Sequence, residues 1–275
     1  MNKEFNKQPL VSIIMNCYNG EKYLEESLKT IISQTYKNWE LIFWDNQSRD
    51  KSAEIFKSFN DKRFKYFLAK DHTTLYMARN LAIEQSNGDY IAFLDTDDLW
   101  ENNKLELQMY RFSNKEVGVV FSNLWMIKKN KRKLYQKEKL PSGKIYDQLI
   151  MDYNVGIVTA VVKKEYYLKL KKKFDGRFSI IGDFDLFLRL SKICLFESIQ
   201  SPLAFYRLHG KNLSTLYKEK EIKESELWLK ENEFNLKEFQ IKNIKQRVYY
   251  RKFINCKIEG KYKECLKILF DFEEK

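Results

Sequence analysis

The chain has 275 residues, of which 44% are hydrophobic and 15% aromatic, so it can bury the core of one large domain or of one domain with an appendage. Charged residues make up 32%, and only 9 Gly and 3 Pro are present, which excludes a wholly disordered, collagen-like or proline-rich protein. The 50 Lys and Arg outnumber the 38 Asp and Glu, and the net charge of +12 favours anionic partners such as phosphates, nucleic acid or acidic lipids.

The first 125 residues alternate between short apolar runs and segments with helical periodicity. Apolar runs predict strands at 10–15, 39–44, 63–68, 90–94 and 117–121, and periodic segments predict helices at 24–32, 51–59, 75–85 and 101–112. Nearly continuous apolar strands that alternate with amphipathic helices predict an α/β fold, with a mostly parallel sheet flanked by helices.

The rest of the chain is less regular. A basic, exposed segment is expected at 128–139, strands at 155–162, 193–199 and 204–208, and a helix at 183–191. From about Lys218 the sequence is rich in Glu and Lys with regularly spaced apolar residues, which predicts two or three helices broken near Gly260. We therefore expect one domain over 1–214 and a C-terminal helical appendage over 215–275.

The four cysteines, Cys17, Cys194, Cys256 and Cys265, form no C-x-x-C pair, and we expect reduced thiols of an intracellular protein. Residues 1–5 lack the features of a signal peptide, and the apolar stretch 155–162 is too short to span a membrane. These features predict a cytoplasmic location, and docking at the inner face of the cell membrane stays open.

The sequence Asp95-Thr96-Asp97-Asp98 places three carboxylates directly after a predicted buried strand. In open α/β sheets, ligands bind at the carboxyl ends of the strands. Crowded carboxylates repel one another, and Mg²⁺ or Mn²⁺ bound by their oxygens would relieve that repulsion. An alternative covers only part of the cluster, because Asp98 and Glu101 also fit a capping pattern for the following helix.

A second acidic pair, Asp183 and Asp185, lies at the start of the predicted helix 183–191. Asp185 precedes Arg189 by four residues, which is the spacing of a helical ion pair. Asp183 has no such local partner, so it is the better candidate for a general base, although an aspartate there also fits a helix cap. Further candidates for metal or phosphate contacts are His209, Arg79 and Arg207.

Six blocks in chain order resemble the family-2 glycosyltransferases, which have the nucleotide-sugar-binding GT-A fold. The resemblance extends over about residues 9–214. The blocks are VSIIMNCYN at 11–19 with the helix that follows, WELIFWDNQS at 39–48, ARN at 78–80, GDYIAFLDTDD at 88–98, GDFDLFLRL at 182–190 and YRLH at 206–209.

The resemblance implies a role for each matched residue. Asp45 would accept a hydrogen bond from the uracil of a UDP-sugar, and the segment Asn16, Cys17 and Tyr18 would border the base and ribose. Arg79 would approach the diphosphate, and Asp95 with Thr96 would lie at the ribose or sugar. The remaining roles are a metal ligand for Asp97, a position near the metal and diphosphate for His209, and the catalytic base for Asp183.

The reaction that the resemblance implies is transfer of a sugar, with inversion, from the nucleotide to a hydroxyl of a glycan or lipid-linked saccharide. The C-terminal helices match no chemistry, so we expect them to pack on the first domain, and peripheral membrane contact is the alternative. Four departures from the family pattern concern the preference for nucleobase and donor sugar. They are Asn16-Cys17 for Pro-Thr, Gln47 for a small residue, residues 72–75 for a glycine-containing loop, and Gly182 for Glu.

Three other functions are weighed against this one. A non-catalytic nucleotide-sugar binder is left open by Gly182. A nucleotidyltransferase is disfavoured because no glycine-rich phosphate loop follows the first strand. A nucleic-acid-binding protein is suggested by the charge, but the basic residues are scattered and match no nucleic-acid-binding motif, so we expect no nucleic-acid partner.

Overall fold

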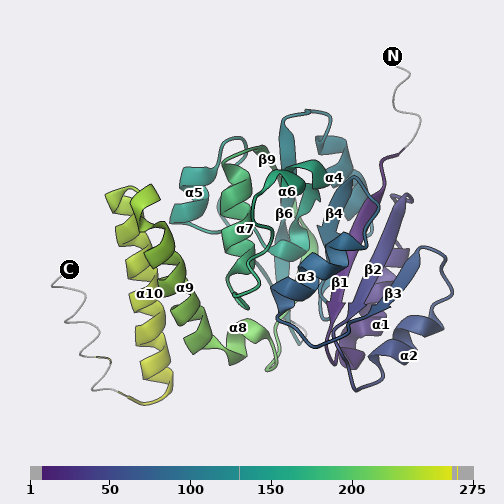
Figure 1. The fold of residues 1–275 in the computed structure, drawn as a ribbon, viewed down its shortest axis with the longest axis horizontal. Coiled ribbons are helices and arrows are strands. Elements are labelled where there is room, and N and C mark those ends of the chain that lie inside the picture. Colours follow the sequence, from purple (N-terminus) through teal and green to yellow (C-terminus); the bar gives the residue numbers. More distant parts are fainter. Residues whose placement is uncertain (1–7, 130, 262–264, 266–275) are drawn as a thin grey trace.

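The structure is a computed structural model that describes residues 8–129, 131–261 and 265 (Figure 1). The prediction that no signal peptide is present concerns residues 1–5, which lie outside the described part. Most of the last 14 residues of the expected appendage also lie outside it.

Within the described residues, nine strands form one sheet in the order β3-β2-β1-β4-β8-β6-β9-β5, and β7 pairs with β6. The sheet is flanked by helices, as expected (Figure 1). The strands are β1 (Val11–Cys17), β2 (Trp39–Asp45), β3 (Phe64–Leu68), β4 (Tyr90–Phe93), β5 (Leu99–Trp100), β6 (Val117–Lys128), β7 (Lys131–Leu134), β8 (Val161–Lys163) and β9 (Leu195–Arg207).

The first four strands of that order are parallel, as the sequence predicts. Every residue of β1 and β2 is buried, because helices and loops cover both faces of this half of the sheet. In the register of the two strands, Cys17 lies beside Asp45, so the polar ends of both strands meet at the same edge. The turn that begins at Asp95 follows β4, the neighbour of β1 on its other side.

The other half of the sheet mixes both strand directions and corrects several expected boundaries. Residues 155–162 are not one strand, because the 3₁₀ helix η2 (Ile157–Thr159) precedes β8. The strands expected at 193–199 and 204–208 are one strand, β9, which stays continuous by pairing along β6 with register shifts. The helix expected at 101–112 begins only at Lys104, because β5 pairs with β9 just before it.

Helices cover the two faces of the sheet and make two separate cores. Apolar residues of α1, α2 and α4 pack on one face, and those of α3, α5, α6 and α7 pack on the other. Their bounds are α1 (Glu21–Ile32), α2 (Ser52–Ser58), α3 (Leu75–Glu84), α4 (Lys104–Arg111), α5 (Tyr146–Met151), α6 (Lys164–Lys169) and α7 (Gly182–Ser191).

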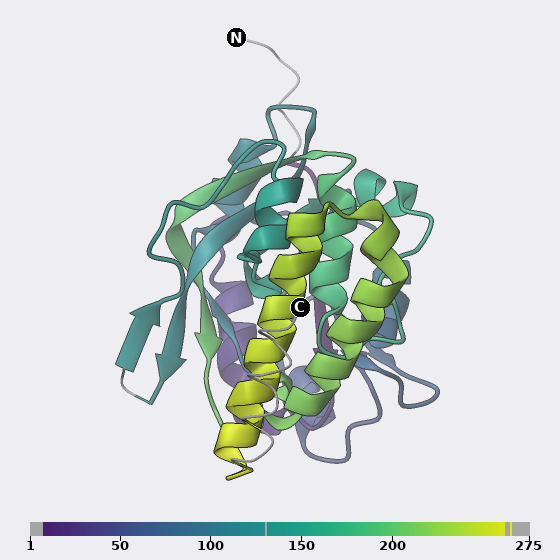
Figure 2. The ribbon, with the colours of Figure 1, turned by 90° about the vertical axis from the view of Figure 1, so that its left-hand side faces the viewer.

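The C-terminal part contains α8 (Leu213–Leu216), α9 (Lys218–Asn232), the 3₁₀ helix η3 (Glu233–Asn235) and α10 (Glu238–Ile258). Helices α9 and α10 run side by side next to α5 and α7 (Figures 1 and 2). The Trp228 ring contacts Phe184 of α7 with their centroids 5.0 Å apart. The expected packing of these helices on the rest of the chain is therefore present. The boundary placed between 214 and 215 falls within α8 and stays a prediction.

The four cysteines, all of which lie in the described residues, are not joined by disulfide bonds. Within the described ranges, none of the helices combines the length and apolar character that crossing a lipid bilayer requires.

Candidate active site

The ends of β1 and β2 carry a group of buried polar side chains. Asp45 is only 1% exposed, and its carboxylate accepts hydrogen bonds from the Tyr66 hydroxyl at 2.6 Å and the Ser48 backbone N–H at 2.8 Å. Asn16 is 9% exposed, and neither polar atom of its side chain has a hydrogen-bond partner. Burial raises the pKa of the Cys17 thiol, so the thiol stays neutral.

Tyr18 differs from its neighbours because its side chain is 53% exposed. Its ring lies 4.3 Å from the His72 ring, measured between centroids. An exposed aromatic ring beside buried polar groups is a suitable surface for a planar base. The structure therefore brings Asn16, Cys17, Tyr18 and Asp45 to one edge of the sheet.

Arg79 and Asp95 form an ion pair between α3 and the turn after β4. The guanidinium lies 2.6 Å from the Asp95 carboxylate, and Arg79 is 2% exposed whereas the Asp95 side chain is 31% exposed. The second terminal nitrogen of Arg79 is buried without a partner. The next residue, Thr96, fixes the turn to α1 because its carbonyl accepts a hydrogen bond from the Ser27 hydroxyl at 2.8 Å.

Asp97 and His209 form a second close pair of side chains in this region. The Asp97 Oδ2 atom lies 2.8 Å from His209 Nε2, and Arg207 donates from Nε to the Asp97 backbone carbonyl at 2.9 Å. Burial and the nearby Asp95 carboxylate raise the pKa of Asp97, and the hydrogen bond with His209 opposes that rise. Among the described residues, no group of three or more His, Cys, Asp or Glu could hold a metal ion by itself.

Asp98 does not cap the helix that follows it. Helix α4 has Asn103 at its N-cap position, whereas the Asp98 carboxylate accepts a hydrogen bond from the Arg207 backbone N–H at 2.9 Å. Burial raises the pKa of Asp98 well above its usual range, and the Asp97 charge adds to that effect. Arg207 also forms an ion pair with Glu26 of α1 at 2.6 Å. The end of β9 is therefore joined both to Asp98 and to α1.

Asp183 lies in the first turn of α7 and is held by neutral donors. The Tyr76 and Tyr153 hydroxyls each lie 3.1 Å from one of its two carboxylate oxygens, and the Phe184 N–H donates at 2.9 Å. Burial raises the pKa of Asp183, while Arg79 and these hydrogen bonds lower it. A buried carboxylate whose pKa is raised is a suitable general base.

The two acidic groups are joined through α3. The Arg79 guanidinium lies 5.1 Å from the centroid of the Tyr76 ring, so one helix contacts Asp95 through Arg79 and Asp183 through Tyr76. Sequence reasoning missed Tyr76 and Tyr153, because no local pattern marks them. It predicted the ion pair of Asp185 correctly: Arg189 lies 2.6 Å from that carboxylate.

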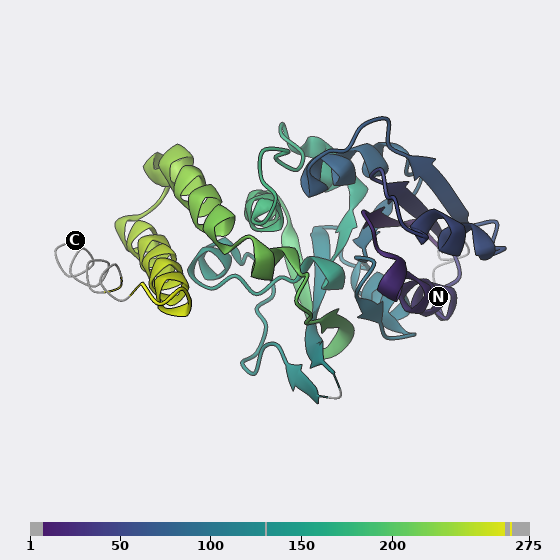
Figure 3. The same ribbon diagram turned by 90° about the horizontal axis from the view of Figure 1, so that it is seen from below.

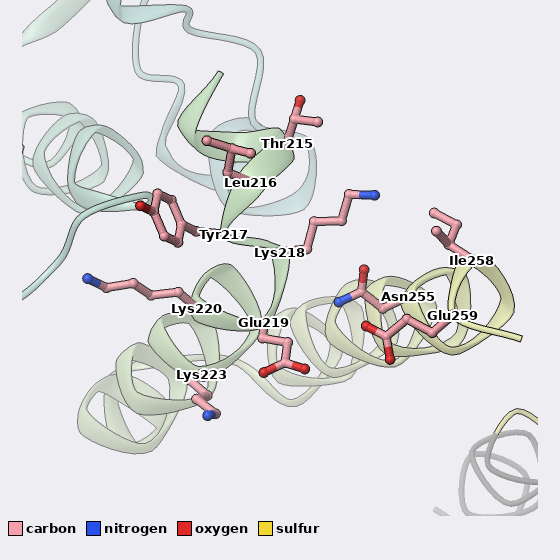
Figure 4. Close-up of a pocket in the computed structure, with 10 residues that line it drawn as sticks. All are labelled: Thr215, Leu216, Tyr217, Lys218, Glu219, Lys220, Lys223, Asn255, Ile258 and Glu259. Atoms are coloured by element: carbon pink, nitrogen blue, oxygen red, sulfur yellow. The ribbon is translucent and has the colours of Figure 1, made fainter. Parts of the chain in front are cut away.

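One pocket borders this group of side chains, and another lies apart from it. One of 330 Å³ borders His209 and is lined by Tyr23, Ile127, Lys128, Lys129, Arg207, Leu208, His209 and Gly210. Residues 127–129 lie at the turn end of the β6–β7 hairpin, which extends away from the body of the molecule (Figure 3). A larger pocket of 590 Å³ lies between the start of α9 and the end of α10 (Figure 4). None of the predicted site residues lines the larger pocket.

Comparison with known proteins identifies the family of the chain. The sequence model of the family described as Glycosyl transferase family 2 matches residues 12–185, a span that includes both acidic groups. The chain belongs to this family. The Escherichia coli protein named UDP-Glc:alpha-D-GlcNAc-diphosphoundecaprenol beta-1,3-glucosyltransferase WfgD is 32% identical over 187 residues, which are 63% of this chain and 73% of that protein. This glycosyltransferase is thus an enzyme of the class that the sequence predicted.

Solved structures show the same fold. Residues 1–349 of Staphylococcus aureus TarS, in complex with UDP-GlcNAc, match with a TM-score of 0.72 and 18% identity over 95% of this chain and 80% of that chain. The mannosyltransferase PcManGT from Pyrobaculum calidifontis, in complex with GDP-Man and Mn²⁺, matches with a TM-score of 0.59 and 16% identity over 80% of this chain and 62% of that chain. The predicted GT-A fold is therefore confirmed.

Proposed function

We propose that this glycosyltransferase moves a sugar, with inversion, from a UDP-sugar to a hydroxyl of a glycan or lipid-linked saccharide. The observation that carries the proposal is the contact series through α3: Asp95 pairs with Arg79, Arg79 faces the Tyr76 ring, and the Tyr76 hydroxyl contacts Asp183. This series joins a guanidinium, a cation of the type that binds phosphates, to a half-buried carboxylate that can accept a proton. The name of WfgD, which includes a UDP-sugar and a diphosphoundecaprenol-linked acceptor, supports the same choice of substrates.

The donor nucleotide is proposed to bind over the ends of β1 and β2. Asn16 offers a buried amide without a protein partner, and Arg79 offers an unpartnered guanidinium nitrogen. Buried polar groups are costly unless they are paired, so a ligand or ordered water that binds them is favoured. Asp45 already accepts from Tyr66 and Ser48, but carboxylate oxygens have further lone pairs with which to accept from uracil. Tyr18 would contact the base with its exposed ring.

Asp97 and His209 are proposed to hold Mg²⁺ or Mn²⁺. Their facing oxygen and nitrogen, 2.8 Å apart, provide two ligands, and a diphosphate and water would complete the set, which is the usual way that proteins bind Mg²⁺ with nucleotides. The pair therefore fits a metal that binds together with its substrate. When bound, such a cation stabilises negative charge on the diphosphate of the leaving group.

Asp183 is proposed to act as the general base. The acceptor hydroxyl gives its proton to the Asp183 carboxylate while its oxygen forms a bond to the anomeric carbon. The bond between that carbon and the diphosphate oxygen breaks, and the nucleoside diphosphate leaves with the electron pair. Arg79 stabilises the charge that develops on the diphosphate.

The function is tested in two stages. A thermal-shift screen of nucleotide sugars, with and without Mn²⁺, should show stabilisation by a UDP-sugar, because a ligand of the native state raises the Tm. The best donor is then incubated with lipid-linked saccharide acceptors, and transferred sugar is measured by mass spectrometry. Binding without transfer to any acceptor would support the alternative, a non-catalytic binder. Stabilisation by a GDP-sugar alone would contradict the choice of donor.

We also propose that the protein acts in the cytoplasm and contacts a membrane peripherally, since a lipid-linked acceptor would be presented there. The C-terminal helices expose Phe234 and Phe239 as well as many lysines. A sedimentation assay with anionic liposomes should recover the full chain at low salt and lose it at high salt. A variant with Phe234→Ser and Phe239→Ser should sediment less with the liposomes. Equal recovery of the variant and the wild type would show that these two side chains do not contact the membrane.

A further inference from the structure

Gly182 and Tyr76 fit together in a way that the sequence did not predict. A Cβ atom at position 182 would lie 2.4 Å from Cδ2 of the Tyr76 ring and 2.6 Å from Cε2 and Cγ. Real Cβ atoms do not approach other atoms so closely. The Tyr76 ring is 3% exposed and therefore lacks an open surface to which it could move. The glycine is thus required for the ring to lie against the first turn of α7.

We propose that Gly182 and Tyr76 act together as a positioning device: the absence of a side chain at 182 admits the tyrosine ring, whose hydroxyl orients the Asp183 carboxylate toward the acceptor. This inference rests on the proposed role of Asp183 as general base. It assigns a function to the absence of a side chain at position 182. Tyr76 is then a positioning residue that acts through Asp183.

The Tyr76 hydroxyl can serve both protonation states of a general base. It lies 3.1 Å from Asp183 Oδ1 and 3.1 Å from the Ile180 carbonyl oxygen, and it has one proton to donate. While Asp183 is ionised, the proton points to the carboxylate. Once Asp183 has taken the acceptor's proton, the hydroxyl can turn to the Ile180 carbonyl and accept from the carboxylic acid. The Tyr153 hydroxyl, by contrast, donates to the Oδ2 atom of Asp183.

Other charged and titratable groups also act on Asp183. Arg79 of α3 favours the ionised carboxylate, and its guanidinium faces the Tyr76 ring. Glu221 of α9 and Tyr135, which follows β7, couple electrostatically to Asp183 as well. A Tyr76→Phe substitution leaves these groups in place and removes one hydrogen bond. Because hydrogen bonds to a carboxylate are stronger than those to the neutral acid, the variant should have a higher pKa at Asp183.

The test uses the whole protein labelled with ¹³C at the aspartate side-chain carboxyls. A pH titration by NMR follows the Asp183 signal, which is assigned by its loss in Asp183→Asn. Tyr76→Phe should move the midpoint to higher pH. Tyr167→Phe is the matched control, because Tyr167 is equally buried and its hydroxyl contacts Asn80 at 2.8 Å instead. An unchanged midpoint in Tyr76→Phe would overturn the proposal.

The pH profile of kcat/KM gives a second readout. In Tyr76→Phe, the acid limb of the profile should move to higher pH. Below the midpoint, kcat/KM should fall about tenfold, because the loss of one hydrogen bond to a charged group costs a free energy of about that size. At alkaline pH, kcat/KM should return to the wild-type value. Tyr167→Phe should keep the wild-type profile. If the wild type transfers no sugar at all, the proposed function fails, but the NMR titration still decides whether Tyr76 controls Asp183.

Gly182→Ala tests the same contact from the other side, because it keeps the Tyr76 hydroxyl and changes only residue 182. The added methyl should displace the ring and move the Asp183 midpoint upward as Tyr76→Phe does. The double variant should show little further shift, because both changes break the same contact. Fully additive shifts would mean that Gly182 and Tyr76 act separately, which would overturn the pairing. Far-ultraviolet circular dichroism confirms that each variant is folded before titration.

Discussion

The two acidic groups of this glycosyltransferase are built from the same residue type in opposite surroundings. In the turn after β4, Asp95 pairs with the Arg79 guanidinium, and Asp97 lies beside the His209 imidazole. At the start of α7, Asp183 faces two neutral hydroxyls and a backbone N–H. Burial raises the pKa of both Asp97 and Asp183, so the two groups differ in the partners that surround them and not in the direction of this shift.

The difference shows how aspartate side chains in two surroundings can be suited to two tasks. A carboxylate that shares a site with cations is suited to hold a metal and its phosphates. A carboxylate in a less polar setting, with its pKa raised by burial, is suited to proton transfer. The following experiments test this division between the two groups, starting with the largest expected effect.

Asp183→Asn should lower kcat by about 10²–10⁴-fold, because the amide cannot accept the acceptor's proton. Nucleotide affinity, measured by isothermal titration calorimetry, should stay near the wild-type value. Asp185→Asn is the matched control two residues away, since its carboxylate pairs with Arg189 and the Trp228 indole and should affect stability rather than kcat. Full turnover by Asp183→Asn would remove the distinction between the two groups.

Asp97→Asn should lower kcat on the order of 10²-fold and weaken activation by Mn²⁺, because one of the two proposed ligands becomes a neutral amide. The measurement is a Mn²⁺ titration of the transfer rate in wild type and variant. The wild type should lose activity in excess chelator and regain it when Mn²⁺ is restored. Undiminished activity in chelator would show that the Asp97–His209 pair serves some purpose other than metal binding.

Gly182→Ala should lower the free energy of unfolding by about 1–3 kcal/mol, because the methyl overlaps the buried Tyr76 ring. Urea denaturation followed by fluorescence gives the value. Gly210→Ala is the control, since nothing lies within 4 Å of a Cβ at that position, and it should change stability by less than about 1 kcal/mol. Equal effects of the two substitutions would mean that the ring moves aside freely.

Glu40 extends the comparison to a buried carboxylate with a structural role. Burial alone would raise its pKa, but hydrogen bonds from Lys65 at 2.5 Å, Ser12 at 2.6 Å and Asn87 lower it from 4.5 to about 2. A depressed pKa adds stability that is complete above about pH 4.5 and is lost as the pH falls through about 2.

The prediction for Glu40→Gln follows from that window. The variant should be less stable than wild type by about 1–2 kcal/mol near pH 7, at the modest end because the Lys65 side chain is 38% exposed. The difference should narrow as the pH approaches 2. Urea denaturation at several pH values measures it, and a difference that is constant with pH would show that the carboxylate charge is not responsible.

Much of the fold was predictable from the sequence because its signals are local. Apolar runs between turn residues marked β1 to β4, and helical spacing marked α1, α3 and α7, so the parallel half of the sheet and its acidic edge followed directly. The mixed half was less predictable. Strand β9 reads as two apolar segments, and only its pairing along β6 makes them one strand.

The site divides in the same way. Local sequence determined that Asp95, Asp97 and Asp183 end a strand or begin a helix, since each lies at a change of periodicity. Only the tertiary structure decided which side chains surround them: Tyr76 and Tyr153 at Asp183, and Arg207 at Asp98. The first and last of these contacts join residues 107 and 109 positions apart, and no pattern within a strand or helix encodes which distant side chain folding brings to a given carboxylate.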